Sequence, residues 1–192
     1  MGVSMGGMIA QDYAANFANN SSYTNPRILS LTFACTYARP SPFCSRMFSL
    51  WSELAINMSV QHVMKDVLLW AFTVPFFLER KKELKEVEDG MQNLDMGTPE
   101  YLAQLNVIQT FDSRKFLRLS SEDGEAPGRL GSSAKVMVLA GEEDILIPVI
   151  LSKELHDLIP GAVWKTCRGG HGACWEFPNE FNNAYLDFLA GL

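Results

Sequence analysis

A serine, an aspartate and a histidine that lie far apart in the sequence each stand in a setting that suits nucleophilic catalysis. Ser4 lies within Gly-Val-Ser-Met-Gly-Gly at 2–7, and an apolar stripe with helical spacing follows over 8–17. A Gly-x-Ser-x-Gly turn between a strand and a helix strains the backbone and exposes the serine hydroxyl. We expect glycine at Gly2 and Gly6 because side chains there would collide with the neighbouring strand and helix. The pattern predicts Ser4 as the nucleophile.

A serine hydroxyl needs a base, and the chain has three histidines to supply it. His62 and His156 lie in amphipathic stretches and are typical of helix surfaces. His171 lies in the glycine-flanked segment 168–176, directly after the strand-like run 162–167. A side chain in such a loop can reach over the edge of a sheet, so we predict His171 as the general base and a plain surface histidine as the weaker alternative.

The acid is expected in the acidic cluster after the apolar run 135–140. Catalytic groups of open α/β sheets gather beyond the carboxyl ends of the strands. Asp144 is our choice; Glu142 and Glu143 are interpreted as solvated loop charges, and Asp112 is an outside candidate. Ser4, Asp144 and His171 then follow the order Ser, Asp, His, which is that of the α/β-hydrolase fold.

Three motifs together resemble an α/β-hydrolase of the lipase, esterase and 3-oxoadipate enol-lactonase kind. They are Gly-Val-Ser-Met-Gly-Gly at 2–7, Ala-Gly-Glu-Glu-Asp-Ile-Leu-Ile-Pro at 140–148, and Gly-Gly-His-Gly at 169–172 with Trp175, Glu176 and Pro178 after it. The resemblance implies Ser4 as nucleophile, Asp144 as orienting acid and His171 as base. It also implies the backbone N–H of Met5 as one oxyanion donor.

The same resemblance implies a parallel sheet of about eight strands in which the elbow follows the fifth. The sequence offers strand candidates at 27–34, 135–140 and 162–167. We therefore expect an α/β protein with a partial α/β-hydrolase fold: about three parallel strands, flanking helices and a helical cap insertion. Without a strand before the elbow, the first candidate would have an unpaired apolar edge that carries Ile28, Leu29, Leu31 and Phe33.

The chain divides into three predicted parts. Residues 1–38 hold the elbow, its helix and the following strand; 39–118 form a helical cap; 119–192 hold the strands and helices that carry the acid and histidine loops. The breaker-rich segment 120–133 is expected to be a mobile loop. The cap has helical patterns at 47–57, 60–72, 75–92 and 99–111.

The most apolar cap segments are expected to line a substrate site. Their large side chains are Trp70, Phe72, Phe76 and Phe77. Packing inside the cap is an equally good interpretation for any one of them. The segment is too short, and too interrupted by Pro75, to span a membrane.

Composition narrows the class of partner. A net charge of −6 argues against nucleic acid. The four cysteines have no metal-ligand spacing and are expected to be free thiols in a reducing, cytoplasmic compartment. Cys174 lies near the predicted site but is not expected to be the nucleophile. We expect neither metal nor organic cofactor.

These observations predict a serine hydrolase that acts on an apolar carboxylic ester or lactone through an acyl-enzyme. The alternative is a truncated product that keeps the triad residues and acts, if at all, by binding. An acyltransferase would use the same serine with a different acceptor. We expect the 192-residue chain alone to fold poorly and to be nearly inactive, with Ile9, Tyr13 and Phe17 exposed.

Overall fold

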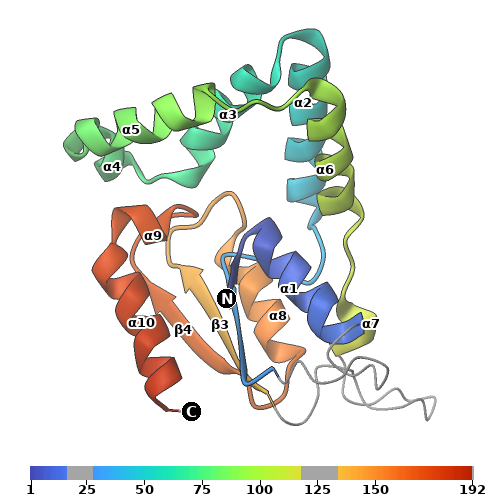
Figure 1. Ribbon diagram of the computed structural model, residues 1–192, viewed down its shortest axis with the longest axis vertical. Coiled ribbons are helices and arrows are strands. Elements are labelled where there is room, and N and C mark those ends of the chain that lie inside the picture. Colours follow the sequence, from blue (N-terminus) through green and yellow to red (C-terminus); the bar gives the residue numbers. More distant parts are fainter. Residues whose placement is uncertain (17–27, 118–133, 192) are drawn as a thin grey trace.

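A four-stranded parallel sheet forms the centre of the described part of the chain, which in this computed structural model comprises residues 1–16, 28–117 and 134–191 (Figure 1). Its strands lie side by side in chain order: β1 (Gly2–Val3), β2 (Ser30–Ala34), β3 (Lys135–Gly141) and β4 (Val163–Cys167). The helices are α1 (Met5–Asn16), α2 (Pro42–Asn57), α3 (Val60–Ala71), α4 (Val74–Glu79), α5 (Lys81–Gln92), α6 (Thr98–Thr110), α7 (Arg114–Leu117), α8 (Val149–Asp157), α9 (Ala173–Glu176) and α10 (Pro178–Ala190).

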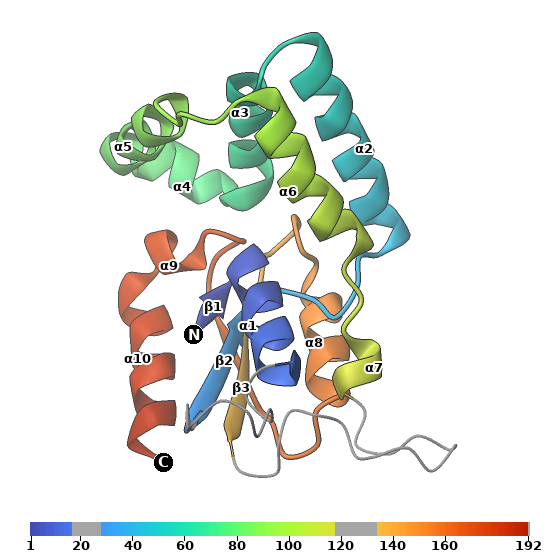
Figure 2. The same ribbon diagram turned by 45° about the vertical axis from the view of Figure 1, so that its right-hand side comes forward.

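Helices cover both faces of the sheet, which explains why β3 is a continuous apolar run. Successive side chains of a strand point to opposite faces. Val136 and Val138 of β3 pack in one cluster with residues of α1, α7 and α8. Met137 and Leu139 pack in a second cluster with residues of α9 and α10. Figure 2 shows α10 on one side of the sheet and α1 and α8 on the other.

The predicted strands at 135–140 and 162–167 are confirmed by β3 and β4. The candidate at 27–34 is confirmed as β2 over Ser30–Ala34, and residue 27 lies outside the described residues. The expectation of an unpaired edge on β2 is wrong at the carboxyl end, because β1 pairs Gly2 with Phe33 and Val3 with Ala34. Two residues suffice for this pairing since the strand needs only to lead into the turn at Ser4.

Helices α2–α6 form a layer over the carboxyl ends of the strands (Figures 1 and 2). We call them the helical layer. Its buried apolar side chains form one cluster that also contains Met8 of α1 and Leu146, Ile147 and Leu151 from the region after β3. The helical layer and the loop after β3 therefore share a hydrophobic core.

The predicted helix at 75–92 is divided in two at Arg80. Arg80 has φ −116° and ψ 46°, and it both ends α4 and precedes α5. The division allows Phe76 of α4 to be buried while the charged residues of α5, except the partly buried Glu88, remain exposed. On α5, Lys82–Glu86 and Lys85–Asp89 form exposed ion pairs, as expected of a solvated helix face.

The chain returns from the helical layer to the sheet at Ser113. Its N–H donates to the carbonyl of Ala38 at 2.9 Å, and its hydroxyl donates to Gln11 Oε1 of α1 at 2.7 Å. Leu117 of α7 then packs in the sheet cluster. The predicted loop at 120–133 lies outside the described residues. Among the described helices none is long and apolar enough to cross a membrane.

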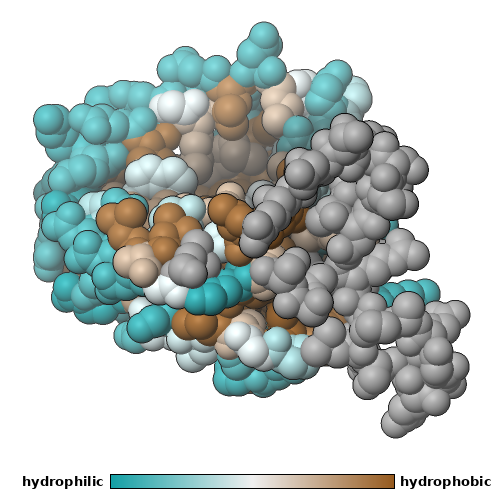
Figure 3. All heavy atoms as spheres, turned by 60° about the horizontal axis from the view of Figure 1, so that its bottom comes forward, coloured by the Kyte–Doolittle hydropathy of each residue, from teal (hydrophilic) through white to brown (hydrophobic). Residues whose placement is uncertain are grey.

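Several apolar side chains are exposed, in part as expected. Ile9 and Tyr13 on α1 are 61% and 43% exposed, and Leu29 before β2 is 60% exposed. Phe17 lies outside the described residues. Figure 3 looks toward the amino-terminal ends of the strands and shows apolar residues on this face, with hydrophilic residues around them.

The glycines of the elbow have unequal roles. A Cβ atom on Gly2 would lie 2.1 Å from the carbonyl oxygen of Gly6, so the entering strand requires glycine. A Cβ atom on Gly6 would meet no described atom within 4 Å, so the expected collision there is wrong. It is Gly7 whose Cβ atom would collide, at 2.6 Å from Thr36 Cγ2. The missing side chain at Gly2 leaves room for the backbone of α1, and the missing side chain at Gly7 leaves room for Thr36, which follows β2.

We predict that Gly2→Ala destabilises the fold by about 1–3 kcal/mol, because the clash is with backbone that must shift. Gly6→Ala is the matched control and should change the free energy of unfolding by less than about 1 kcal/mol, since alanine is also the better helix former. Denaturant unfolding of both variants measures the difference. Equal unfolding midpoints would contradict the steric argument.

Candidate active site

Ser4 lies on a sharp turn between β1 and α1. Its φ is +54°, which is rare for a residue other than glycine and confirms the expected strained backbone. The turn is held because the Ser4 N–H donates to the carbonyl of Ala34, and the Gly7 N–H donates to the carbonyl of Ser4, both at 2.9 Å. Met5 is the first residue of α1, so its N–H belongs to the first-turn groups that lack an intrahelical acceptor.

Asp144 lies in the loop after β3 and is buried, with 1% of its side chain exposed. One carboxylate oxygen, Oδ1, accepts a hydrogen bond from the N–H of Ile147 at 2.8 Å. The loop is closed by a second bond, from the Asp144 N–H to the carbonyl of Gly141 at 3.2 Å. The other oxygen, Oδ2, is thereby oriented toward the loop after β4.

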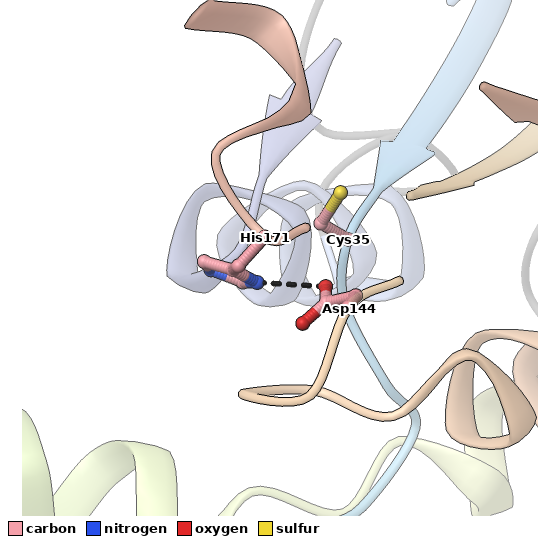
Figure 4. Close-up of side chains that lie close together, drawn as sticks. All are labelled: Cys35, Asp144 and His171. Atoms are coloured by element: carbon pink, nitrogen blue, oxygen red, sulfur yellow. Dashed lines mark hydrogen bonds and ion pairs between the residues drawn. The ribbon is translucent and has the colours of Figure 1, made fainter. Parts of the chain in front are cut away.

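His171 lies between the aspartate and the serine. Its Nδ1 is 2.9 Å from Asp144 Oδ2, and its Nε2 is 2.9 Å from Ser4 Oγ. Figure 4 shows the histidine ring directed at the carboxylate. A carboxylate can only accept, so we assign the ring proton to Nδ1, which leaves Nε2 to accept from the serine hydroxyl. The three predicted residues therefore come together within hydrogen-bond distance, with His171 between Asp144 and Ser4.

The acid and histidine loops are joined backbone to backbone. The N–H groups of Glu142 and Glu143 donate to the carbonyls of Cys167 and Gly169, both at 2.9 Å. A Cβ atom on Gly141 would lie 2.2 Å from the carbonyl oxygen of Gly170. This close approach fixes Asp144 and His171 relative to one another.

Cys35 is a buried neighbour of this pair that the sequence did not single out. Its Sγ, an Asp144 carboxylate oxygen and a His171 ring nitrogen all lie within 4.8 Å of one another (Figure 4). Burial raises the pKa of the Cys35 thiol well above its usual value, and the negative charge of Asp144 adds to the rise. We therefore interpret Cys35 as a neutral thiol that packs beside the acid.

The other candidate residues lie elsewhere. Asp112 accepts hydrogen bonds from Arg114, and its side chain is 38% exposed. Glu142 and Glu143 are exposed, as expected of loop charges. Cys174 is partly buried and packs with the cluster beneath α9; burial raises its pKa as well.

The two remaining histidines are on helices, as expected. His62 is exposed on α3, where its Nδ1 lies 2.8 Å from Ser59 Oγ. His156 on α8 lies against Trp164.

The four aromatic residues expected at the substrate site have different surroundings. Phe72 is buried beside the histidine loop, where a Cβ atom on Gly172 would lie 2.4 Å from its ring. Phe76 stacks on Phe72 with ring centroids 4.5 Å apart. Phe77 is partly buried against the core of the helical layer. Trp70 contacts Phe43 of α2, and its indole N–H donates to Asp66 at 3.0 Å. Phe72 and Phe76 therefore lie nearest to the histidine loop by these contacts.

The fold and the arrangement of Ser4, Asp144 and His171 are those of an α/β-hydrolase. The family model described as alpha/beta hydrolase fold matches residues 1–178, and the chain belongs to that family.

Two solved structures resemble this chain over nearly its whole length, and one further protein resembles a shorter part of it. The enol-lactonase from Burkholderia xenovorans LB400 is 22% identical and superposes with a TM-score of 0.80, over 98% of this chain and 64% of its own. An esterase from Thermogutta terrifontis is 18% identical with a TM-score of 0.73, over 99% and 63%. The Putative carbamate hydrolase RutD of Caulobacter sp. (strain K31) is 39% identical over 57 residues, which are 29% of this chain and 21% of that protein. The chain spans less than two thirds of these relatives, and at this identity the structural likeness describes the fold alone.

We predict that Asp144→Asn slows covalent labelling of Ser4 by a fluorophosphonate by roughly 10²–10⁴-fold, because an amide in place of the carboxylate favours the wrong histidine tautomer. Asp112→Asn, which removes the exposed alternative acid, should label at the wild-type rate. The measurement is the second-order labelling rate. A loss with Asp112→Asn and none with Asp144→Asn would reverse the assignment of the acid.

Proposed function

We propose that this chain carries the catalytic centre of a serine hydrolase that cleaves an apolar carboxylic ester or lactone through an acyl-enzyme. The observation that carries the proposal is the continuous line of hydrogen-bond distances from Ser4 Oγ through His171 to Asp144, at 2.9 Å each. Family membership supports hydrolase chemistry, and the strained backbone of Ser4 at the turn before α1 supports its role as nucleophile.

In the acylation step, Ser4 Oγ attacks the carbonyl carbon of the substrate and its proton passes to His171 Nε2. Asp144 stabilises the resulting imidazolium through the hydrogen bond to Nδ1. The N–H of Met5, at the start of α1, is the proposed donor to the oxyanion. When the tetrahedral intermediate collapses, the alcohol leaves with the proton from Nε2 and Ser4 keeps the acyl group.

In the deacylation step, a water molecule gives a proton to the same Nε2 and attacks the acyl carbon. The second intermediate collapses to the carboxylic acid, and Ser4 Oγ takes the proton back from His171. For a lactone, the leaving alcohol and the acid belong to one product. The cycle needs neither a metal nor an organic cofactor.

The substrate class is proposed from the surroundings of His171. Phe72 and Phe76 form a stacked apolar pair next to Gly172, which suits an acyl chain or an apolar ring. We retain Trp70 and Phe77 of the helical layer as further candidates. The solved relatives named above include an enol-lactonase and an esterase, which agrees with this class.

Two alternatives share these residues. An acyltransferase would pass the acyl group from Ser4 to an acceptor other than water. A non-catalytic protein would keep the triad as inheritance and act by binding. The non-catalytic alternative is considered because the chain spans 64% of the length of the enol-lactonase.

We predict that Ser4→Ala abolishes both fluorophosphonate labelling and turnover of short p-nitrophenyl esters, because the attacking oxygen is removed. Ser45→Ala, on the exposed side of α2, is the control and should behave as wild type. The assay is run on the 192-residue chain and on any longer in-frame product that transcripts reveal. Unchanged turnover in Ser4→Ala would refute the proposal, and an unlabelled wild type in every form would favour the non-catalytic alternative.

We predict that Phe76→Ala shifts the acyl-chain preference toward longer chains, because the stacked partner of Phe72 is lost and space opens beside the histidine loop. Trp70→Ala should shift it less, since Trp70 is held by Phe43 and Asp66. The ratio of kcat/KM for p-nitrophenyl octanoate and acetate measures the shift. An unaltered ratio in Phe76→Ala would mean that Phe76 only packs inside the helical layer and does not contact the substrate.

A further inference from the structure

Glu176 is a buried carboxylate that the proposed mechanism does not use. It lies at the end of α9 and is 5% exposed. Its Oε1 accepts a hydrogen bond from the N–H of Gly170 at 2.7 Å, directly before His171. Its Oε2 accepts from the N–H of Thr73 at 3.2 Å and from the Thr73 hydroxyl. One side chain thus joins the histidine loop to the junction between α3 and α4.

The residue after His171 is joined to the same junction. The N–H of Gly172 donates to the carbonyl of Ala71 at 2.7 Å. A Cβ atom on Gly170 would lie 2.7 Å from this carbonyl oxygen, and one on Gly172 would meet the ring of Phe72. The histidine is therefore held on both sides by the segment Ala71–Thr73, and the two glycines permit the approach.

The hydrogen bonds that the structure gives to Glu176 all come from amide and hydroxyl donors. Burying a charge costs free energy unless strong hydrogen bonds compensate, and bonds to a carboxylate are stronger than neutral ones. Three donors that converge on one carboxylate also specify its position narrowly. Such an arrangement holds two segments at a defined separation, which a simple apolar contact would not do.

We propose that Glu176 is a positioning residue that, with Ala71–Thr73, clamps the histidine loop to the helical layer and so sets the distance from His171 Nε2 to Ser4 Oγ. The inference rests on the proposed function, since it assigns His171 the role of base. Because the clamp runs through α3 and α4, the seating of the helical layer controls the geometry of the base. A misplacement of 1 Å at a reacting group can cost roughly 10²-fold in rate.

The test compares Glu176→Gln with two further variants. Glutamine has the size of glutamate but presents an NH₂ group to one set of donors, so one half of the clamp is lost. Thr73→Val removes the hydroxyl donor and keeps the backbone N–H, and Thr73→Ser restores the hydroxyl. Glu180→Gln is the matched control, because the Glu180 side chain is 41% exposed and its hydrogen bonds hold the same loop at Arg168 and not at the segment Ala71–Thr73.

Three readouts are taken on folded protein: the fluorophosphonate labelling rate, the amide exchange rate of Gly170, and the proton resonance of His171 Nδ1–H. We expect Glu176→Gln to label about 10–100-fold more slowly, to speed exchange at Gly170 and to shift the Nδ1–H resonance. Thr73→Val should label more slowly by a smaller factor, and Thr73→Ser should recover the wild-type rate. Glu180→Gln should match wild type in all three readouts.

The outcomes separate this inference from the proposed function. Wild-type protein that is not labelled in any form, neither as the 192-residue chain nor as a longer in-frame product, refutes the proposed function, and the clamp is then judged on exchange and resonance alone. Labelling of wild type together with unchanged readouts in Glu176→Gln overturns the clamp. An equal loss in Glu180→Gln also overturns it, because general loosening of the loop would then explain the effect. If Glu176→Gln does not fold, a wild-type labelling rate in Thr73→Val overturns the clamp.

Discussion

The arrangement of the site depends on the close backbone approach between the loops that follow β3 and β4. Gly141 and Gly170 lie so near one another that neither chain path could be kept with a side chain on Gly141. Two backbone hydrogen bonds, from Glu142 and Glu143, hold the loops in this register. Because Asp144 and His171 lie on these two loops, the loop register places their side chains within hydrogen-bond distance. Ser4 is positioned separately, by the pairing of β1 with β2.

Much of the site could be predicted from the sequence because its signals are local. The glycines around Ser4 and His171, the apolar run before Asp144 and the order of the three residues are all readable within short windows. Strand β3 was predictable because a buried parallel strand is a continuous apolar run. Strand β4 is mostly exposed or partly buried, and its signal is the run of β-branched and aromatic residues at Val163, Trp164 and Thr166. The two-residue strand β1 was not predictable, since its existence depends on pairing with Phe33 and Ala34.

The features that could not be predicted from the sequence depend on contacts between segments that are far apart along the chain. Glu176 and Thr73 are separated by 103 positions, and no spacing rule links them. The residues on both sides of Arg80 favour one continuous helix, but the chain turns at Arg80. The turn lets α4 face the core with Phe76 while most charged residues of α5 face solvent. Cys35 has an ordinary strand-end setting in the sequence, and only the fold brings its thiol beside Asp144. Gly6 shows the opposite error, since a motif position was given a steric role that the surroundings do not require.

The shared hydrophobic core between the helical layer and the region after β3 bears on how such a protein can diverge. Leu146, Ile147 and Leu151 belong to the same cluster as the side chains of α2, α3, α4 and α6. Insertions that exchange as modules keep few apolar contacts with their host, whereas this layer is rooted in the segment that carries the acid. Recombination that brought in a foreign layer would have to bring matching residues after β3, so the helical layer and the segment that carries Asp144 are constrained to change together.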